Sequence, residues 1–315
     1  MNRRVVYFNG TIVPEAEARI SIYDSGVSMG DMAFEVTRTY RQKPFRLDQH
    51  VARLYHTLEA IHVDPRIDQA EMLRATEETL VRNLPTESDD MDWNIIHNVS
   101  SGPAPAFLSA FEPDDCRPTV IVSCFPLLWK MAALAPAYDS GIDLVVPPQR
   151  AIPASLFDPT IKTRSRFHYH LAATQADRLL AGSWAVLVDP DGYLTEGTIG
   201  NVFLVLGSEL HTPRAINILP GVTRSAVFEL AEQNGIACHE VDLTIDDAAR
   251  ADEMFITSTS IGLLQARSFE RRSIGDGHLG PVTARLRSAF EQAVGLDFAA
   301  QARDYAQRLA ASQNG

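Results

Sequence analysis

The feature that most constrains the fold of this chain is the stretch from Asp191 to Arg224. Its apolar run Asn201–Leu206 predicts a buried strand. The run Leu219-Pro-Gly-Val-Thr-Arg224 then contains a glycine turn that leads into a helix, predicted over Ser225–Gln233. Such a turn presents unpaired backbone N–H groups and the positive end of the helix dipole, which together favour an anion or a phosphate. Taken alone, it is more often an ordinary connection between a strand and a helix.

Glu196, in the same stretch, lies beside the predicted strand. A carboxylate is costly away from water unless it has a partner, so a buried Glu196 would need a cation or hydrogen-bond donors. A single glutamate in a hairpin is equally compatible with a solvated surface position. The residues around it therefore have to decide its role.

Composition narrows the classes of function. The chain has 315 residues, 45% of them hydrophobic, which is enough for two domains with their own cores. Its net charge of −12 disfavours nucleic acid and anionic membranes as partners. No apolar run is long enough to span a bilayer, and the start lacks an apolar signal-peptide core. Cys116, Cys124 and Cys238 are unclustered and no metal-ligand spacing is present, so we expect no disulfides, no metal and a cytoplasmic location.

Periodicity predicts an α+β chain with short strands interleaved with helices. Asn9-Gly10 marks a hairpin turn, and Asp48 is the expected N-cap of a helix. The expected strands are 5–8, 11–13, 35–41, 44–47, 92–100, 118–124, 142–146, 184–189, 193–196, 201–206, 236–241 and 253–259. The other expected helices are 68–83, 168–181 and 281–311. Residues 127–140, with several alanines and one proline, are expected to link a small domain of residues 1–126 to a larger domain of residues 141–315.

The whole string from Asp191 to Arg224 favours the functional interpretation of its parts. It combines Glu196 with Asn201-Val-Phe, Leu210-His-Thr and Leu219-Pro-Gly-Val-Thr-Arg. This pattern closely resembles the signature of the class IV aminotransferases, the fold-type IV family of pyridoxal 5'-phosphate (PLP) enzymes. The resemblance implies a small N-terminal α/β domain and a larger C-terminal domain with a pseudo-barrel of strands. It also implies PLP as cofactor and a homodimer whose active sites are completed across the dimer interface.

Lys162 resembles the Schiff-base lysine of that family. Its run Ile-Lys-Thr ends an apolar strand, precedes a helix and is similar to the family's Ile-Lys-Ser segment. Without the signature, Lys162 would be interpreted as a solvated lysine at a strand end. By the same resemblance, Glu196 is the partner of the pyridinium nitrogen, whose proton an opposite charge stabilises.

The resemblance also assigns the phosphate contacts. The backbone N–H groups of Val222 and Thr223, the Thr223 hydroxyl, Arg53 and Thr259 would hold the phosphate. Arg53 lies in a His-x-x-Arg-Leu run like that of the family, although periodicity alone would place it on the surface of an amphipathic helix.

The substrate contacts come from two other segments. The N–H groups of Ser260 and Ile261 would face the substrate carboxylate. Phe34 and Arg38 lie in a run similar to the family's Phe-Glu-Gly-x-Arg, and the resemblance places them at the substrate pocket.

The chain departs from the family pattern at several positions. Arg166 stands where the family has a tyrosine that donates to the phenolate oxygen of the cofactor, and we expect Arg166 to take that role; Tyr169 is the less favoured substitute. Met29 and Val36 replace a tyrosine and a glycine, which predicts a narrower and less polar pocket. The family's Tyr-x-Arg and Arg-x-His pairs near the substrate are not visible in this sequence.

We therefore expect a transaminase that moves an amino group between a branched-chain-type amino acid and a 2-oxo acid. Lys162 would form the Schiff base and move the substrate α-proton. D-amino acid or (R)-amine transaminases are the nearest alternatives, followed by a PLP lyase of the aminodeoxychorismate type. A PLP-binding protein without catalysis is the least expected, because both Lys162 and Glu196 are present.

Overall fold

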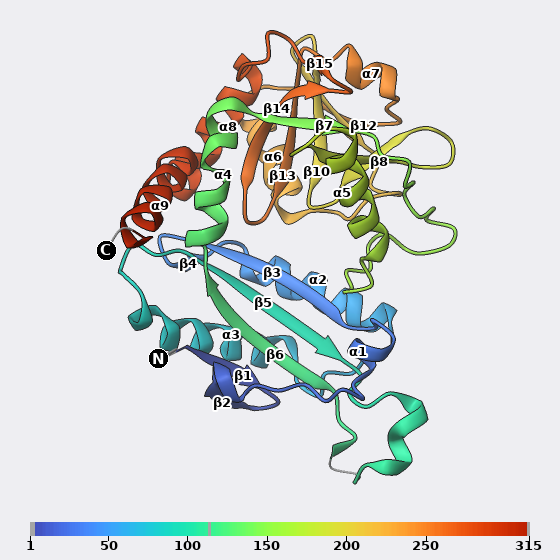
Figure 1. Ribbon diagram of the computed structural model, residues 1–315, viewed down its shortest axis with the longest axis vertical. Coiled ribbons are helices and arrows are strands. Elements are labelled where there is room, and N and C mark those ends of the chain that lie inside the picture. Colours follow the sequence, from blue (N-terminus) through green and yellow to red (C-terminus); the bar gives the residue numbers. More distant parts are fainter. Residues whose placement is uncertain (1–3, 113–114, 314–315) are drawn as a thin grey trace. The chain divides into compact units, whose positions relative to one another are not determined.

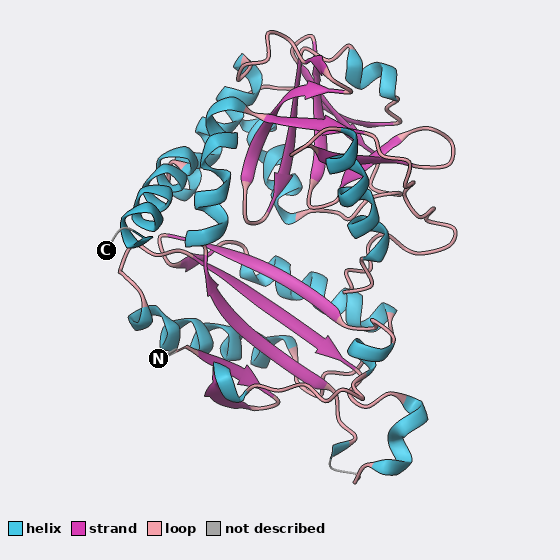
Figure 2. Ribbon diagram, viewed as in Figure 1, coloured by secondary structure: helices cyan, strands magenta, loops and turns pink. Residues whose placement is uncertain are grey.

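A computed structural model describes residues 4–112 and 115–313 as two compact units. The first unit comprises the described residues up to Leu127 together with Ile161–Arg166. The second comprises Leu128–Thr160 and the described residues from Phe167 onward. Figures 1 and 2 show that each unit combines helices with a sheet, which confirms the predicted α+β class.

The first unit is a six-stranded antiparallel sheet with two long helices packed against it. The hydrogen-bonded order of the strands is β2-β1-β6-β5-β3-β4. Helices α2 and α3 bury their apolar stripes, in which Leu54, Leu58 and Met72 are at most 1% exposed. The elements are β1 (Val5–Phe8), β2 (Thr11–Pro14), η1 (Glu15–Glu17), α1 (Ser25–Ser28), β3 (Ala33–Tyr40), β4 (Lys43–Pro44), α2 (Leu47–Ala60), α3 (Gln69–Asn83), η2 (Leu84–Thr86), β5 (Trp93–Ser100), η3 (Pro105–Ala110) and β6 (Thr119–Pro126).

Local turn and cap signals account for much of this unit. Asn9 and Gly10 have φ of 48° and 95°, as a hairpin turn with two left-handed residues requires, so the predicted hairpin is confirmed. Asp68 caps α3 by accepting from the backbone N–H of Glu71 at 2.7 Å. The predicted cap of α2 is wrong: the helix begins at Leu47 after Arg46, so Asp48 lies within its first turn.

Strand β3 carries two sets of side chains because neighbouring residues of a strand point to opposite faces of the sheet. Glu35 lies on the face covered by α2, where it contacts Arg53. Phe34 and Arg38 lie on the other face.

The segment Ile161–Arg166 adds to the sheet beside the start of β3. Thr163 forms an antiparallel bridge with Ala33. The backbone N–H of Phe34 donates to the carbonyl of Lys162 at 2.9 Å, and that of Arg164 donates to the carbonyl of Met32 at 2.8 Å. This pairing is the reason that Lys162 belongs to the first unit, whereas the sequence placed it in the C-terminal domain.

The second unit is a nine-stranded mixed sheet surrounded by helices. The order is β12-β11-β10-β13-β14-β7-β8-β9, with β15 beside β14. Strand β9, at one end of this order, also contacts β10, and Gly197 N–H donates to the carbonyl of Gly200 at 2.8 Å. The sheet therefore curls on itself, as the pseudo-barrel expectation requires. The elements are α4 (Leu128–Ser140), β7 (Ile142–Val145), α5 (Phe167–Leu179), β8 (Trp184–Val188), β9 (Leu194–Gly197), β10 (Asn201–Leu206), β11 (Glu209–Pro213), α6 (Val222–Gln233), β12 (Cys238–Val241), α7 (Ile245–Ala249), β13 (Glu253–Ser258), β14 (Gly262–Phe269), β15 (Arg272–Ser273), α8 (Pro281–Val294) and α9 (Phe298–Gln313).

Two segments of the second unit differ from the sequence prediction. Leu128–Ser140, within the expected linker 127–140, forms α4, because Met131 and Tyr138 are buried in its packing and the helix contacts α9. Pro136 lies inside that helix and does not end it. The helical region expected over 281–311 consists of two helices, divided where Gly295 adopts the left-handed conformation with φ of 68°.

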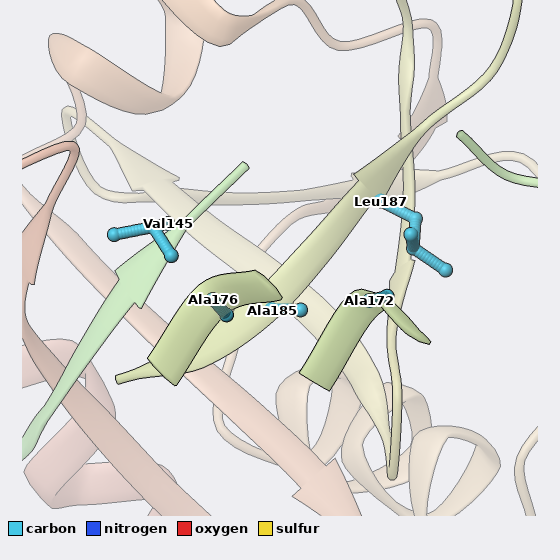
Figure 3. Close-up of a cluster of buried hydrophobic side chains, with 5 residues drawn as sticks. All are labelled: Val145, Ala172, Ala176, Ala185 and Leu187. Carbon is cyan, nitrogen blue, oxygen red and sulfur yellow. The ribbon is translucent and has the colours of Figure 1, made fainter. Parts of the chain in front are cut away.

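Small side chains hold helix α5 close to the sheet of the second unit. Figure 3 shows Ala172 and Ala176 of α5 facing Ala185 and Leu187 of β8, with Val145 of β7 beside them. Tyr169, one turn earlier in α5, packs against the same cluster. The cluster therefore determines where the Tyr169 side chain lies.

Candidate active site

Lys162 lies on the Phe34 face of the first unit. Its backbone N–H donates to the Thr57 hydroxyl of α2 at 3.2 Å, and its Nζ lies 4.6 Å from the centre of the Phe34 ring. The side chain is half-buried. The backbone pairing of the extended segment fixes the position of the Lys162 Cα. The flexible side chain of Lys162 therefore starts beside the Phe34 ring.

Two arginines share that face. The guanidinium carbons of Arg164 and Arg166 lie 4.0 Å and 5.7 Å from the centre of the Phe34 ring. Three cations are thus gathered around one aromatic ring, an arrangement that the ring quadrupole stabilises and mutual repulsion opposes. Sequence analysis singled out Arg166 but not Arg164.

Arg53 is tied to a buried carboxylate on the other face of the sheet. Its Nε and Nη2 donate to the two oxygens of Glu35, each at 2.8 Å. His50 Nδ1 lies 3.1 Å from Glu35 Oε1, and Glu35 is completely buried. Arg53 is therefore not a solvated helix residue, and its predicted phosphate contact stays a prediction; the sequence analysis gave Glu35 and His50 no role.

Electrostatics favour the charged form of this pair. Burial raises the pKa of Glu35, but the charge of Arg53 and the hydrogen bond of His50 outweigh burial and hold that pKa well below its usual value. Burial also lowers the pKa of His50, although Glu35 raises it in part. The guanidinium is therefore fixed in orientation by a permanent anion.

Arg38 is buried within the first unit. Its Nε donates to the carbonyl of Thr39 at 3.3 Å, and its guanidinium carbon lies 4.3 Å from the centre of the Tyr40 ring. The structure brings Arg38 and Phe34 onto one face of β3.

The carboxylate of Glu196 is surrounded by donors in the second unit. The Tyr169 hydroxyl donates to Oε1 at 2.6 Å. Oε2 accepts from Asn201 Nδ2 at 3.1 Å and from the backbone N–H of Leu219 at 3.2 Å. Glu196 is only 8% exposed, so the surface interpretation of this residue is wrong for the second unit. Charge-assisted hydrogen bonds of this kind orient a carboxylate and stabilise its negative charge.

The turn before helix α6 leaves the helix start without a side-chain cap. The N-cap residue is Gly221, and no side chain bonds the first N–H groups, which belong to Val222 and Thr223. A Cβ at Gly221 would lie 2.2 Å from Asn201 Oδ1, so only glycine allows this approach. Because Asn201 Nδ2 also donates to the carbonyl of Leu219 at 2.9 Å, one side chain links the Glu196 carboxylate to this turn.

Thr259, Ser260 and Ile261 form the turn between β13 and β14. The Ile261 N–H donates to the carbonyl of Ser258 at 3.2 Å, and its own carbonyl accepts from the Tyr138 hydroxyl at 2.6 Å. Ser260 and Ile261 are buried, and Thr259 is half-buried. These bonds fix the turn in place.

The second unit thus offers two binding features that suit two different chemical groups of one ligand. A donor-lined carboxylate suits a protonated ring nitrogen, and an uncapped helix start with a threonine hydroxyl suits a phosphate. Among the described residues, no three His, Cys, Asp or Glu side chains are grouped so as to hold a metal ion. Within the same residues, no helix is long and apolar enough to cross a membrane.

Comparison with known proteins identifies the family. A family model described as Amino-transferase class IV matches residues 32–269. A Methanocaldococcus jannaschii protein named "Putative branched-chain-amino-acid aminotransferase" is 32% identical over 290 residues, covering 91% of this chain and 95% of that protein. The D-alanine aminotransferase of Bacillus licheniformis is 28% identical over 290 residues, covering 92% and 96%.

A solved structure agrees. The branched-chain aminotransferase of Thermobaculum terrenum in its PLP form has a TM-score of 0.79 and 25% identity, covering 96% of this chain and 97% of that chain. The chain belongs to the class IV aminotransferases, which are fold-type IV enzymes that use PLP. The resemblance, the fold class and the assignment as an aminotransferase are confirmed.

The donor sets of this chain match that cofactor. Glu196 with its three donors suits the ring nitrogen, and the glycine-capped start of α6 suits the phosphate. Sequence reasoning missed the roles of Tyr169 and Asn201 at the carboxylate. Asn201 stands within the signature string, so the string carried a signal for it; Tyr169 lies in a distant helix and had none.

Proposed function

We propose that this chain is a PLP-dependent transaminase that moves an amino group between a branched-chain-type amino acid and a 2-oxo acid. The observation that carries the proposal is the Glu196 carboxylate, buried and held by Tyr169, Asn201 and the Leu219 N–H. A carboxylate oriented in this way can stabilise the positive charge of a protonated ring nitrogen. The relatives named as branched-chain aminotransferases support the choice of donor.

Each polar residue then has a distinct task. When bound, PLP supplies a ring that takes up electron density from the substrate. Glu196 holds the proton at the ring nitrogen. Lys162 would hold the cofactor through its Nζ and, once that amine is free, would take up and move the substrate α-proton. Arg166 donates to the phenolate oxygen.

Four residues would hold the phosphate. The N–H groups of Val222 and Thr223 begin α6, where the helix dipole favours an anion. Arg53 adds a cation that Glu35 keeps oriented, and Thr259 adds a hydroxyl from the β13–β14 turn. The chemistry thus depends on Lys162 and Glu196. Retention of the cofactor depends on the four residues that would hold its phosphate.

The substrate contacts are proposed from two segments. The turn of Ser260 and Ile261 receives the α-carboxylate of the substrate. Phe34 and Arg38, on one face of β3, line the space for its side chain, and Phe34 places an apolar surface directly beside Lys162. An apolar wall there suits an aliphatic side chain.

A second candidate is transamination of D-amino acids. The D-alanine aminotransferase of Bacillus licheniformis covers as much of this chain as the branched-chain relatives do. An (R)-amine transaminase would be recognised by the same substrate panel. Release of pyruvate without an amino acceptor would instead identify a lyase.

The test combines a chemical map with a substrate panel. Borohydride reduction of the yellow protein, followed by peptide mapping, should place a pyridoxyl adduct on Lys162. An adduct on Lys130 or another lysine would refute the assignment. L- and D-amino acids and both enantiomers of a chiral aryl amine, each with pyruvate or 2-oxoglutarate, should show fastest transfer from L-leucine, L-isoleucine or L-valine.

We also propose a homodimer in the cytoplasm. Large apolar side chains are exposed on the segment before β3, where Ile22, Val27 and Met29 are 76%, 61% and 64% exposed. Tyr23 of the same segment packs on Phe107 at 4.9 Å between ring centres. Exposed apolar groups that cluster in this way suit burial by a second copy. The three cysteines are all free, as a reducing compartment favours. Light scattering should give twice the chain mass, and Val27→Asp should lower it towards the monomer.

A further inference from the structure

The turn between β13 and β14 is buried, although turns usually lie at the surface. It comprises Thr259, Ser260 and Ile261 and is followed by Gly262, which has φ of 70°. Ser260 and Ile261 are only 4% and 0% exposed. Backbone groups that are shielded from water need hydrogen-bond partners in the protein. The residues that supply these partners therefore determine the conformation of the turn.

Tyr138 of α4 is one of these residues. Its hydroxyl donates to the carbonyl of Ile261 at 2.6 Å, and its side chain is buried. The N–H of Ile261 donates to the carbonyl of Ser258 at 3.2 Å. The first bond holds the peptide group that follows the Ile261 Cα, and the second holds the peptide group that precedes it. Because peptide groups are planar, the two bonds together restrain both backbone dihedrals of Ile261.

Arg287 of α8 restrains Tyr138 in turn. Its guanidinium carbon lies 5.2 Å from the centre of the Tyr138 ring, and its Nη1 donates to the Tyr138 carbonyl at 3.4 Å. Arg287 Nε donates to Glu291 Oε1 at 3.1 Å, so the guanidinium is itself held in place. The Tyr138 ring therefore lies against a fixed cation, and its hydroxyl stays directed at Ile261.

Phe298, the first residue of α9, packs against the end of the turn. A Cβ at Gly262 would lie 2.6 Å from a ring carbon of Phe298, so only glycine allows the ring to approach so closely. Phe298 is completely buried, and its N–H donates to Glu291 Oε1 at 3.1 Å. Glu291 thus links Phe298 to Arg287. Side chains of three helices hold the turn in addition to its own backbone bond.

We propose that Tyr138 is a positioning residue that holds this turn in the conformation that receives the α-carboxylate of the substrate. The inference rests on the proposed function, which assigns that carboxylate to the turn of Ser260 and Ile261. Backbone N–H groups bind a carboxylate best when their directions are fixed in advance, because binding then has no disorder to remove. Without the Tyr138 hydroxyl, the buried Ile261 carbonyl loses a partner and the turn gains freedom to rearrange. Binding of the carboxylate then weakens, whereas the residues that move the proton are unchanged.

The kinetic experiment compares two tyrosine variants of the holoenzyme. Tyr138→Phe keeps the buried ring and removes only the hydroxyl. Its KM for L-leucine should rise about 3- to 10-fold at nearly constant kcat, as expected for the loss of one neutral hydrogen bond that supports binding. The matched control is Tyr305→Phe in α9, because Tyr305 is 1% exposed and its hydroxyl accepts from Gln301 Nε2 at 3.3 Å.

The control separates positioning of the turn from general stability. Tyr305→Phe should lower the free energy of unfolding in urea, as the loss of a buried hydrogen bond does, and keep the parental KM. A parental KM in Tyr138→Phe overturns the inference. So does an equal rise of KM in both variants, or a fall of kcat at constant KM in Tyr138→Phe, since neither result is a specific loss of substrate binding.

Direct binding gives a readout that needs no turnover. Calorimetry should detect binding of the aliphatic carboxylate 4-methylpentanoate to the parent holoenzyme. The affinity should be about 3- to 10-fold lower in Tyr138→Phe and parental in Tyr305→Phe. If the parent transfers an amino group from no amino acid, the proposed function fails, and this titration still decides whether Tyr138 positions a carboxylate site. No binding to the parent, or equal affinities in the parent and Tyr138→Phe, overturns the inference.

Discussion

Replacing Glu35 by glutamine should destabilise the first unit strongly, because it breaks a buried ion pair from one side. Glu35 is completely buried, and the side chain of Arg53 is 10% exposed. Two hydrogen bonds of 2.8 Å join them. Removing one partner of such a pair leaves the other charge buried without compensation, which costs about 3–5 kcal/mol. His50, at 3.1 Å from the same carboxylate, loses its charged neighbour as well.

The matched control is an ion pair of the same chemistry on the surface. Arg82 Nη2 and Glu78 Oε1 of α3 are 2.6 Å apart, with side chains 56% and 52% exposed. Water and salt screen this pair, so Glu78→Gln should cost only about 0.3–0.5 kcal/mol. The difference between the two glutamate variants therefore measures burial rather than the loss of a carboxylate.

Urea unfolding monitored by tryptophan fluorescence can follow this unit alone. Trp93 of β5 is completely buried in it, whereas Trp129 and Trp184 belong to the second unit. In a background with both of the latter replaced by phenylalanine, and in PLP-free protein so that no phosphate compensates Arg53, Glu35→Gln should lower the unfolding midpoint at constant slope. A free energy of unfolding within about 0.5 kcal/mol of that of Glu78→Gln would refute the account of Glu35.

Three further predictions test other parts of the protein. Arg53→Ala should weaken retention of PLP on dialysis by about 1.5–3 kcal/mol and Thr223→Ala by about 0.5–1.5 kcal/mol, and equal retention in Arg53→Ala and the parent would return Arg53 to a structural role. Tyr169→Phe should lower kcat less than Glu196→Gln does, with absorbance showing PLP still bound; equal losses would show that the Tyr169 hydroxyl does more than orient Glu196. Burial lowers the pKa of His97 to about 4, whereas the pKa in the unfolded chain is about 6.5. As the pH falls below 6.5, the unfolded chain therefore binds a proton at His97 and the folded protein does not. The free energy of unfolding should drop by about 2 kcal/mol between pH 7 and pH 5. His97→Asn should remove that share of the slope in urea titrations at both pH values, and an unaltered slope would show that His97 is charged when folded.

Signals that act over a few residues were predictable. The Asn9-Gly10 turn and the glycine turn before α6 need particular residues at particular backbone angles, so the sequence displays them. The long signature around Glu196 likewise predicted the family, because the residues of the signature lie close together in the sequence.

Signals that depend on tertiary packing were not predictable in this way. The composition of residues 128–140 and Pro136 favoured a linker, yet burial of Met131 and Tyr138 stabilises a helix there. Helix propensity is a weak preference that such packing overrides. The strand β14, which pairs with β13 and β7, was not predicted either.

The segment around Lys162 shows why the chemistry of this chain needed the structure. In the sequence, Lys162, Arg164 and Arg166 are three basic residues in an irregular run before a helix, and each could be solvated. The Ala33–Thr163 bridge pairs the run with β3, and the period of two then places Lys162 and Arg164 on the face of Phe34. A tight turn, in which the Arg166 N–H donates to the Arg164 carbonyl at 2.7 Å, brings Arg166 beside them. A shift of this pairing by one residue would turn Lys162 and Arg164 towards the opposite face and Thr163 towards Phe34. The register of one bridge, set by residues more than a hundred positions apart in the sequence, therefore determines both where the proposed cofactor lysine lies and which charges surround it.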